Sequence, residues 1–195
     1  MPLPTISTPT YELVLPSSNR KIKYRPFLVK EEKILILAME SQDPKQIARA
    51  VKDVISKCIL SKGIKVEKLS TFDIEYLFLN IRGKSVGEQI EVMVTCPDDK
   101  KTQVPMSINI DSIKVKTDDE HTTDIKLDDI YTLRMKYPSL DEFIKSNFNF
   151  ESNMNVDDTF DLIASCIDQV YSDEESWSHQ ECTKKELNQF VDQLN

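Results

Sequence analysis

The residue types that perform nucleophilic or metal chemistry are few in this chain. It contains two histidines, His121 and His179, among 195 residues. Each lies in a polar stretch, and a Ser-His-Asp or Cys-His site cannot be drawn from sequence order alone. His179 and Cys182 have the i, i+3 spacing that places two metal ligands on one side of a helix, but no third or fourth ligand accompanies them. We treat this spacing as coincidence.

The four cysteines are Cys58, Cys96, Cys166 and Cys182, and they are widely separated. Structural metal sites use close cysteine pairs, which are absent from the sequence. Cys58 and Cys166 lie on apolar helical stripes and are expected to be reduced core thiols. Cys96 opens a segment similar to one half of a zinc-ribbon hairpin, without its second ligand. We therefore expect no metal and no cofactor.

Carboxylates could support a hydrolase, which needs two of them across one cleft, one with a raised pKa. The adjacent pairs are Asp98-Asp99, Asp118-Asp119, Asp128-Asp129, Asp157-Asp158 and Glu174-Glu175. Most of these pairs occupy expected turns or helix starts, and nothing in the sequence selects one of them. The chain has only three glycines, which argues against phosphate-binding loops. We expect no enzymatic activity.

Charge is unevenly distributed along the chain. Residues 151–195 hold eleven acidic residues against Lys184 and Lys185, a net charge of −9, whereas the whole chain carries −8. Such an acidic segment would repel phosphates, so we expect no nucleic-acid binding. No run of eighteen apolar residues is present in the sequence, so no membrane-spanning segment is expected. The first residues lack the pattern of a secretory signal, which predicts action in the cytoplasm.

The first 86 residues predict a β-hairpin followed by three helices. Asp43 and Pro44 form a typical helix start, because aspartate caps the helix and proline suits its first position. Ser70–Asp73 provides a further cap, and Gly83 and Gly87 bracket the end of the third helix. The expected strands cover 11–15 and 21–24, and the first two helices cover 29–41 and 44–60.

From Gly87 onward the apolar residues alternate as they do in β-strands. The expected strands cover 90–95, 104–110, 113–116, 123–127 and 131–136. Because neighbours in the sequence usually pair, we expect a central antiparallel meander over 87–137.

Residues 138–195 predict an acidic helical segment. Ser139 and Glu142 have the spacing of a capping box, and a helical apolar stripe runs from Phe160 to Tyr171. Thr183 and Glu186 cap a last helix. The expected fold is α+β, with three parts at 1–86, 87–137 and 138–195.

Four separated motifs in this order cover most of the chain. They are Arg25-Pro-Phe-Leu-Val-Lys-Glu-Glu-Lys33, Ser70-Thr-Phe-Asp-Ile-Glu-Tyr-Leu-Phe-Leu79, Ile81-Arg-Gly-Lys-Ser-Val-Gly87 and Met135-Lys-Tyr-Pro-Ser-Leu140. With them the chain resembles the baseplate hub assembly proteins of contractile-tailed (myovirus-type) bacteriophages. The resemblance implies a chaperone-like assembly factor, or a hub subunit, that acts by protein–protein binding.

The resemblance also implies partners and a location. The partners would be other baseplate hub or central-spike proteins of the phage tail. The protein would act in the host cytoplasm during assembly, or stay in the tail baseplate of the virion. The alternative is a baseplate-associated cell-wall hydrolase, since phage baseplates commonly carry such enzymes.

Partner contact is expected mainly from residues 157–195. Trp177 is the only tryptophan and lies in a polar, acidic context, where it forms either a contact patch or a cover over the final helix. The last apolar stripe stays periodic to the end of the sequence and could pack on a partner. Arg25 and Phe27 are residue types found at binding hot spots, although a structural role between hairpin and helix is favoured. The partner-binding candidates are Trp177, Leu187, Phe190, Val191, Leu194, Arg25 and Phe27.

Overall fold

The computed structural model describes residues 6–116, 118, 120–140 and 156–194. Contacts group the chain into two compact units. Unit 1 comprises Met1–Val66 and Phe72–Lys116, and unit 2 comprises Glu67–Thr71 and Thr117–Asn195. Helices and antiparallel sheets occur together, so the α+β class is confirmed. The three-part division at 86/87 and 137/138 stays a prediction.

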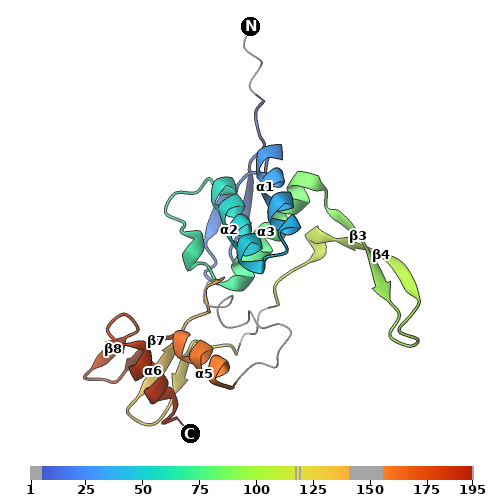
Figure 1. Ribbon diagram of the computed structural model, residues 1–195. Coiled ribbons are helices and arrows are strands. Elements are labelled where there is room, and N and C mark those ends of the chain that lie inside the picture. The colour runs from blue at the N-terminus through green and yellow to red at the C-terminus, as the bar shows by residue number, and fades with distance from the viewer. Residues whose placement is uncertain (1–5, 117, 119, 141–155, 195) are drawn as a thin grey trace. The chain divides into compact units, whose positions relative to one another are not determined.

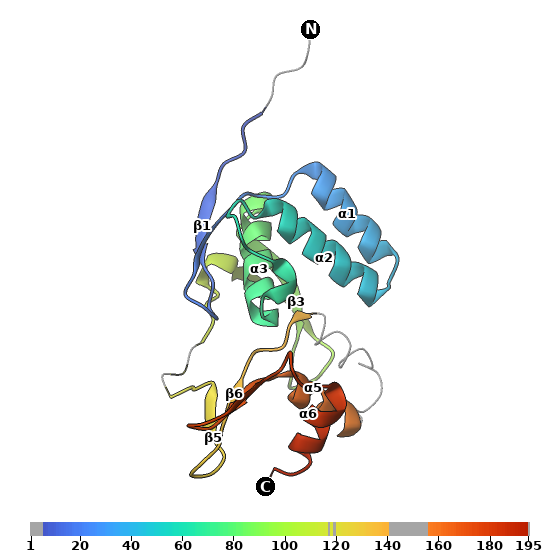
Figure 2. The same cartoon turned by 90° about the vertical axis from the view of Figure 1, so that its left-hand side faces the viewer.

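Unit 1 begins with the hairpin and three helices expected from the sequence (Figures 1 and 2). The strands are β1 (Tyr11–Val14) and β2 (Lys21–Tyr24), and the helices are α1 (Val29–Glu40), α2 (Pro44–Cys58) and α3 (Thr71–Val86). A 3-10 turn, η1 (Val66–Lys68), precedes α3. Asp43 caps α2 as expected, because its side chain accepts a hydrogen bond of 2.9 Å from the Lys45 N–H.

The core of unit 1 forms where the hairpin meets α2 and α3. Its fully buried apolar side chains come from all three elements, since each presents one apolar face to the others. These side chains include Leu15, Ile22, Tyr24, Val54, Ile55, Leu77 and Ile81. A buried acid, Asp73 at the start of α3, accepts a hydrogen bond of 3.0 Å from the Ser17 N–H and a second from the Ser17 hydroxyl. The turn of the hairpin is thereby attached to α3.

A second buried carboxylate, Glu31, joins the hairpin to the helices. Its Oε1 lies 3.2 Å from Nη2 of Arg25, and its Oε2 accepts a hydrogen bond of 2.7 Å from the Leu28 N–H. The backbone N–H of Arg25 donates a hydrogen bond of 3.0 Å to the Cys58 carbonyl at the end of α2. Burial raises the pKa of the Glu31 carboxyl, but the hydrogen bonds from Arg25 and Leu28 and the nearby positive charges outweigh burial, so the pKa lies below its ordinary value.

The hairpin β3 (Gln89–Thr95) and β4 (Gln103–Asn109) forms a separate two-stranded sheet of unit 1. It ends in a 3-10 turn, η2 (Ile110–Ser112), whose Ile110 is buried beside Gly83 of α3. The predicted strand at 113–116 is wrong, because no strand of the described chain pairs with it and the residues after η2 are irregular. The predicted meander over 87–137 is therefore interrupted after β4.

Unit 2 contains a four-stranded antiparallel sheet in the order β5–β6–β7–β8. The strands are β5 (Asp124–Lys126), β6 (Thr132–Met135), β7 (Ile167–Tyr171) and β8 (Ser176–Ser178), and the described helices are α5 (Val156–Ser165) and α6 (Lys184–Val191). The helix expected to reach Tyr171 ends at Ser165, so its second half was wrongly predicted. Residues 167–171 pair with β6 and β8 instead, which satisfies their backbone on both edges. The helix expected after Ser139 falls mostly on 141–155, outside the described residues.

Glu31→Gln is expected to lower the free energy of unfolding at pH 7 by about 2 kcal/mol, because it leaves the Arg25 guanidinium without its anionic partner. A carboxyl with a lowered folded pKa stabilises the fold above its unfolded pKa of about 4.3, and this stabilisation is lost as pH falls through the folded value. The difference between wild type and variant should therefore shrink below about pH 4.3. Urea unfolding from pH 3 to 7 measures it. Glu40→Gln, at an exposed position of the same helix, is the control, and an equal loss in both variants would contradict the assignment.

Candidate partner-binding groove

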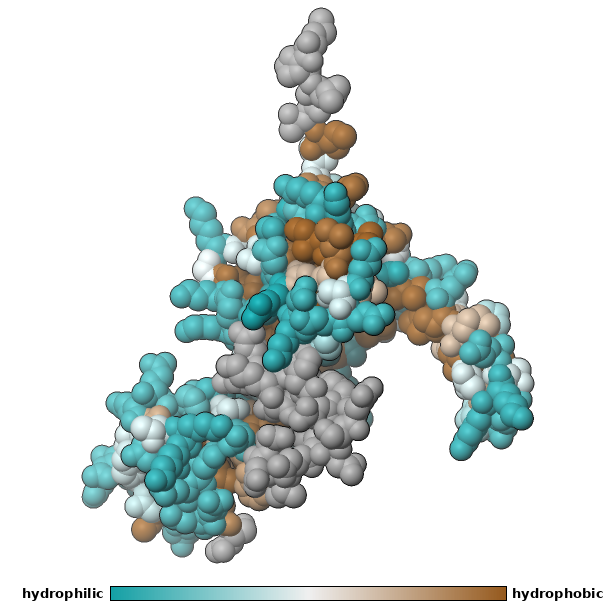
Figure 3. Space-filling model, viewed as in Figure 1, coloured by the Kyte–Doolittle hydropathy of each residue, from teal (hydrophilic) through white to brown (hydrophobic). Residues whose placement is uncertain are grey.

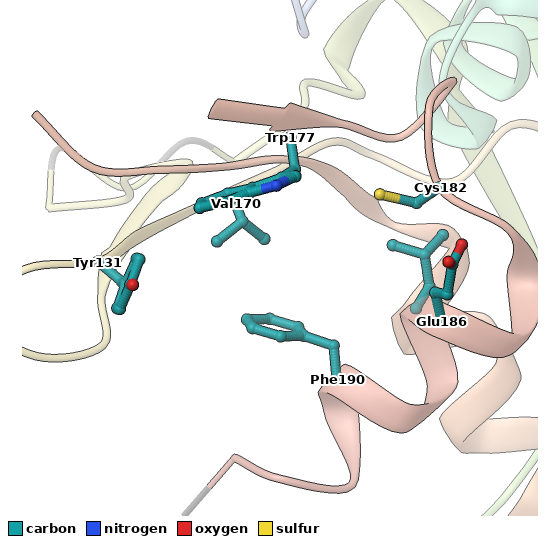
Figure 4. Close-up of a pocket in the computed structure, with 7 residues that line it drawn as sticks. Tyr131, Val170, Trp177, Cys182, Glu186 and Phe190 are labelled. Carbon is teal, nitrogen blue, oxygen red and sulfur yellow. The ribbon is translucent and has the colours of Figure 1, made fainter. Parts of the chain in front are cut away.

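Unit 2 contains an apolar groove of about 390 Å³ beside its sheet (Figure 4). We call it the aromatic groove, because three of its lining residues carry aromatic rings. Its lining residues are Tyr131, Val170, Trp177, Cys182, Glu186, Leu187 and Phe190. They come from the sheet on one side and from α6 and the segment before it on the other.

Strand pairing places the sheet side of the groove. Trp177 on β8 lies opposite Val170 on β7, and Val170 lies opposite Leu133 on β6. Tyr131 precedes β6, and its ring centroid is 6.2 Å from that of Trp177. Aromatic pairs at this distance attract each other, so the two rings hold each other in place. Phe190 reaches toward them from α6 (Figure 4).

The helix side is held by a capping box and by contacts with α5. The Thr183 N–H donates to Oε2 of Glu186 at 2.7 Å, and the Glu186 N–H donates to the Thr183 hydroxyl oxygen at 3.3 Å. Oε2 of Glu186 accepts hydrogen bonds from both the N–H and the hydroxyl of Thr183, and these two bonds lower the pKa of the Glu186 carboxyl, so the rim of the groove is anionic at neutral pH. Asp161 of α5 binds Lys184 and Asn188 of α6, each at 2.7 Å.

The residues of the aromatic groove differ in solvent exposure. Trp177 is 39% exposed and Tyr131 38%, so both rings are accessible from solvent. Leu187 and Val191 are each only 6% exposed and pack with Leu133 in the core of unit 2. The groove therefore has accessible aromatic walls over a buried aliphatic floor.

Three of the seven sequence-based candidates, Trp177, Leu187 and Phe190, come together in this groove. Val191 lies in the core beneath it, and Leu194 is 36% exposed outside its lining. Arg25 and Phe27 belong to unit 1, where Arg25 pairs with Glu31 and the Phe27 N–H donates to the Ser85 hydroxyl at 3.0 Å. Contact of any of these residues with a partner stays a prediction.

Sequence reasoning missed Tyr131, Val170, Cys182 and Glu186 as lining residues. The apolar stripe from Phe160 to Tyr171 predicts a helix at Val170, and the place of Val170 opposite Trp177 follows only from the pairing of β7 with β8. The alternating pattern predicts a strand at Tyr131 and indicates no further role for this residue. Its aromatic side chain beside a turn of acidic residues was the one available signal.

No group of three histidine, cysteine or acidic side chains that could hold a metal ion occurs among the described residues. His121 lies beside Tyr137, with 2.8 Å between its Nε2 and the phenol oxygen. Each described carboxyl group with a shifted pKa is shifted downward, whereas a general acid needs an upward shift.

Comparison with known proteins identifies the class as a tail baseplate protein of T4-like phages. The family model described as "T4 bacteriophage base plate protein" matches residues 8–195, nearly the whole chain, and the chain belongs to this family. No curated protein and no solved structure matches it. No helix in the described part of the chain has the length and hydrophobicity needed to cross a membrane.

Leu187→Ala is expected to lower the free energy of unfolding by about 2–4 kcal/mol, because it removes a buried side chain and leaves a cavity. Leu194→Ala, at an exposed position just after the same helix, should change it by less than about 0.5 kcal/mol. Urea unfolding followed by Trp177 fluorescence measures both. Equal effects of the two substitutions would contradict the separation of floor from surface.

Proposed function

We propose that this protein is a baseplate hub assembly factor, or a hub subunit, that binds hub or central-spike proteins through the aromatic groove. The observation that supports this most is the cluster of Tyr131, Trp177 and Phe190 around an open apolar groove. Binding energy at protein interfaces concentrates on aromatic residues that surround a desolvated pocket. Membership of a baseplate family makes other baseplate proteins the partners to expect.

The charge around the groove suggests what enters it. Glu186 lies on its rim, and Asp173, Glu174 and Glu175 lie in the turn between β7 and β8, next to the strand that carries Trp177. Complementary charges steer association and select between partners. The proposed occupant is therefore an apolar side chain of another baseplate protein, flanked by lysine or arginine residues.

The size of the groove favours a transient, chaperone-like role over permanent attachment by this site alone. A volume of about 390 Å³ accommodates an anchor of one or two side chains. Stable interfaces bury roughly 800 Å² on each partner, which is more than such an anchor provides. A hub subunit would need further contact surface elsewhere on the chain.

Phe190→Ala should weaken binding to the hub or central-spike protein about tenfold or more, since truncating an aromatic anchor at a hot spot costs about 2 kcal/mol. The measurement is calorimetric titration of each purified hub and central-spike protein from the same tail gene cluster. Ile163→Ala on α5 is the matched control, because Ile163 is 40% exposed and does not line the groove.

If the Phe190→Ala and Ile163→Ala variants bind the hub or central-spike protein with equal affinity, the groove is not part of the binding site. Failure of the wild-type protein to bind any of these proteins would refute the proposed function as a whole.

A further inference from the structure

The β3–β4 hairpin presents an apolar face that the described residues leave uncovered. Its cross-strand pairs on this face are Ile90 with Ile108, Val92 with Met106 and Val94 with Val104. None of these six side chains is buried, and Val104 and Met106 are each 52% exposed. Figure 3 shows apolar surface along the part of this arm nearer the helices and hydrophilic surface at its tip. A single charged residue, Glu91, occurs within the two strands.

The two edges of the hairpin differ in their hydrogen-bonding groups. The Ile110 N–H donates to the Glu88 carbonyl and the Cys96 N–H to the Thr102 carbonyl, each at 2.8 Å, so these pairs bond across the ladder. By alternation, the pairs that contain odd-numbered residues direct their N–H and C=O groups outward. The outward residues of β3 are Gln89, Glu91, Met93 and Thr95, and those of β4 are Gln103, Pro105, Ser107 and Asn109.

Pro105 lacks an N–H, so the outer edge of β4 cannot donate a hydrogen bond to a further strand at this position. The outer edge of β3 keeps every N–H. Proteins commonly protect exposed strand edges with proline or charge, because an open edge pairs with other strands. In this hairpin a proline interrupts the β4 edge, whereas the β3 edge carries one charged residue, Glu91, keeps all its outward N–H groups and is not paired with a third strand of the described chain.

The hairpin is held at both ends, so its open edge is preorganised. At its base, Lys84 of α3 pairs with Glu88 and lies 3.4 Å from a carboxylate oxygen of Asp111. At its tip, Asp99 accepts hydrogen bonds from the Thr102 hydroxyl and from the N–H groups of Lys101 and Thr102, which lower the pKa of Asp99 to about 2. Preorganised elements lose less entropy on binding.

We infer that the outer edge of β3 is a strand-docking site for an open sheet edge of another baseplate protein, whose apolar layer covers the face of Ile90, Val92 and Val94. Main-chain hydrogen bonds to the outward groups of β3 would supply affinity, and the apolar face would supply the register. The inference rests on the proposed binding of baseplate proteins and is independent of the aromatic groove.

A second copy of this chain does not satisfy both features of the hairpin. Two-fold pairing of two β3 edges leaves the apolar faces uncovered, and two-fold packing of two faces leaves the edges open. A ribbon with seven-residue strands is about 23 Å long and about 10 Å wide, so a dimer held by face-to-face packing alone would have a footprint of roughly 230 Å² on each copy. This is well below the roughly 800 Å² per partner of a stable interface, so the face alone cannot hold two copies together. A larger, different protein can contact edge and face together.

Met93→Pro tests the edge directly. It removes one outward N–H without removing a ladder hydrogen bond, because Met93 and Pro105 form an outward-directed pair. Ser107→Pro makes the same change on the edge that Pro105 already interrupts, and is the matched control. With purified hub and central-spike proteins as probes, Met93→Pro should weaken binding at least tenfold and Ser107→Pro less than twofold. Circular dichroism checks that both variants fold.

Amide hydrogen exchange of the wild-type protein with and without its partner gives a second readout that needs no variant. The outward amides of Glu91, Met93 and Thr95 should become protected in the complex, while those of Gln103 and Ser107 should not.

Equal effects of the two proline substitutions, or exchange unchanged on β3, would overturn the inference. If Phe190→Ala weakens binding and Met93→Pro does not, the groove is supported and the strand-docking site is refuted. Dimerisation of the chain alone that Met93→Pro abolishes would identify a second copy as the occupant. Absence of any complex would overturn the proposed function and this inference together.

Discussion

The buried carboxylate of Glu31 is the contact on which the organisation of unit 1 depends. It is 1% exposed, so it must be fully partnered, and its partners define the path of the chain from hairpin to helix. Arg25 binds it while donating its N–H to the end of α2, and Leu28 donates its N–H at the start of α1. Between them, the Phe27 N–H donates to Ser85 near the end of α3. One short segment thereby connects all three helices.

This arrangement also determines where the β3–β4 hairpin begins. Ser85 and Gly83 belong to the last turns of α3, and Ile110 at the foot of the hairpin packs against Gly83. The base of the hairpin is therefore attached to the end of α3, while none of the six side chains on its apolar face is buried. Unit 2 also combines a buried core with an accessible surface: Leu187 is buried, and the rings of Tyr131 and Trp177 are exposed. A protein that works by contact needs such surfaces on elements that do not move when a partner binds.

Local sequence signals predicted unit 1 well, because its helix starts and hairpin turn are specified by neighbouring residues. Asp43-Pro44 predicts the start of α2, and in unit 2 the Thr183–Glu186 box predicts the start of α6, since capping is a contact within one turn. The apolar stripe from Phe160 to Tyr171 predicts one helix, which is wrong after Ser165, because Ile167 and Val170 suit a helix or a strand equally. Pairing with Met135 and Leu133, more than thirty residues earlier, decided between them. Periodicity contains no information about such distant partners.

The same limit applies to the groove. Trp177 was found because a lone tryptophan in an acidic context is unusual, and Phe190 because it lies on an apolar helical stripe. Their proximity depends on the register of β8 with β7 and on the packing of α6 against α5, neither of which is local. Identifying the open edge of β3 likewise depends on the strand pairing, which determines which residue pairs direct their N–H groups outward.

The central claim is that this baseplate protein works by binding a hub or central-spike protein. Native mass spectrometry of the chain co-expressed with those proteins tests it most directly. The account predicts a complex of the chain with one of them at a fixed ratio. Detection of the chain only as a monomer, or only as an oligomer of itself, would contradict it.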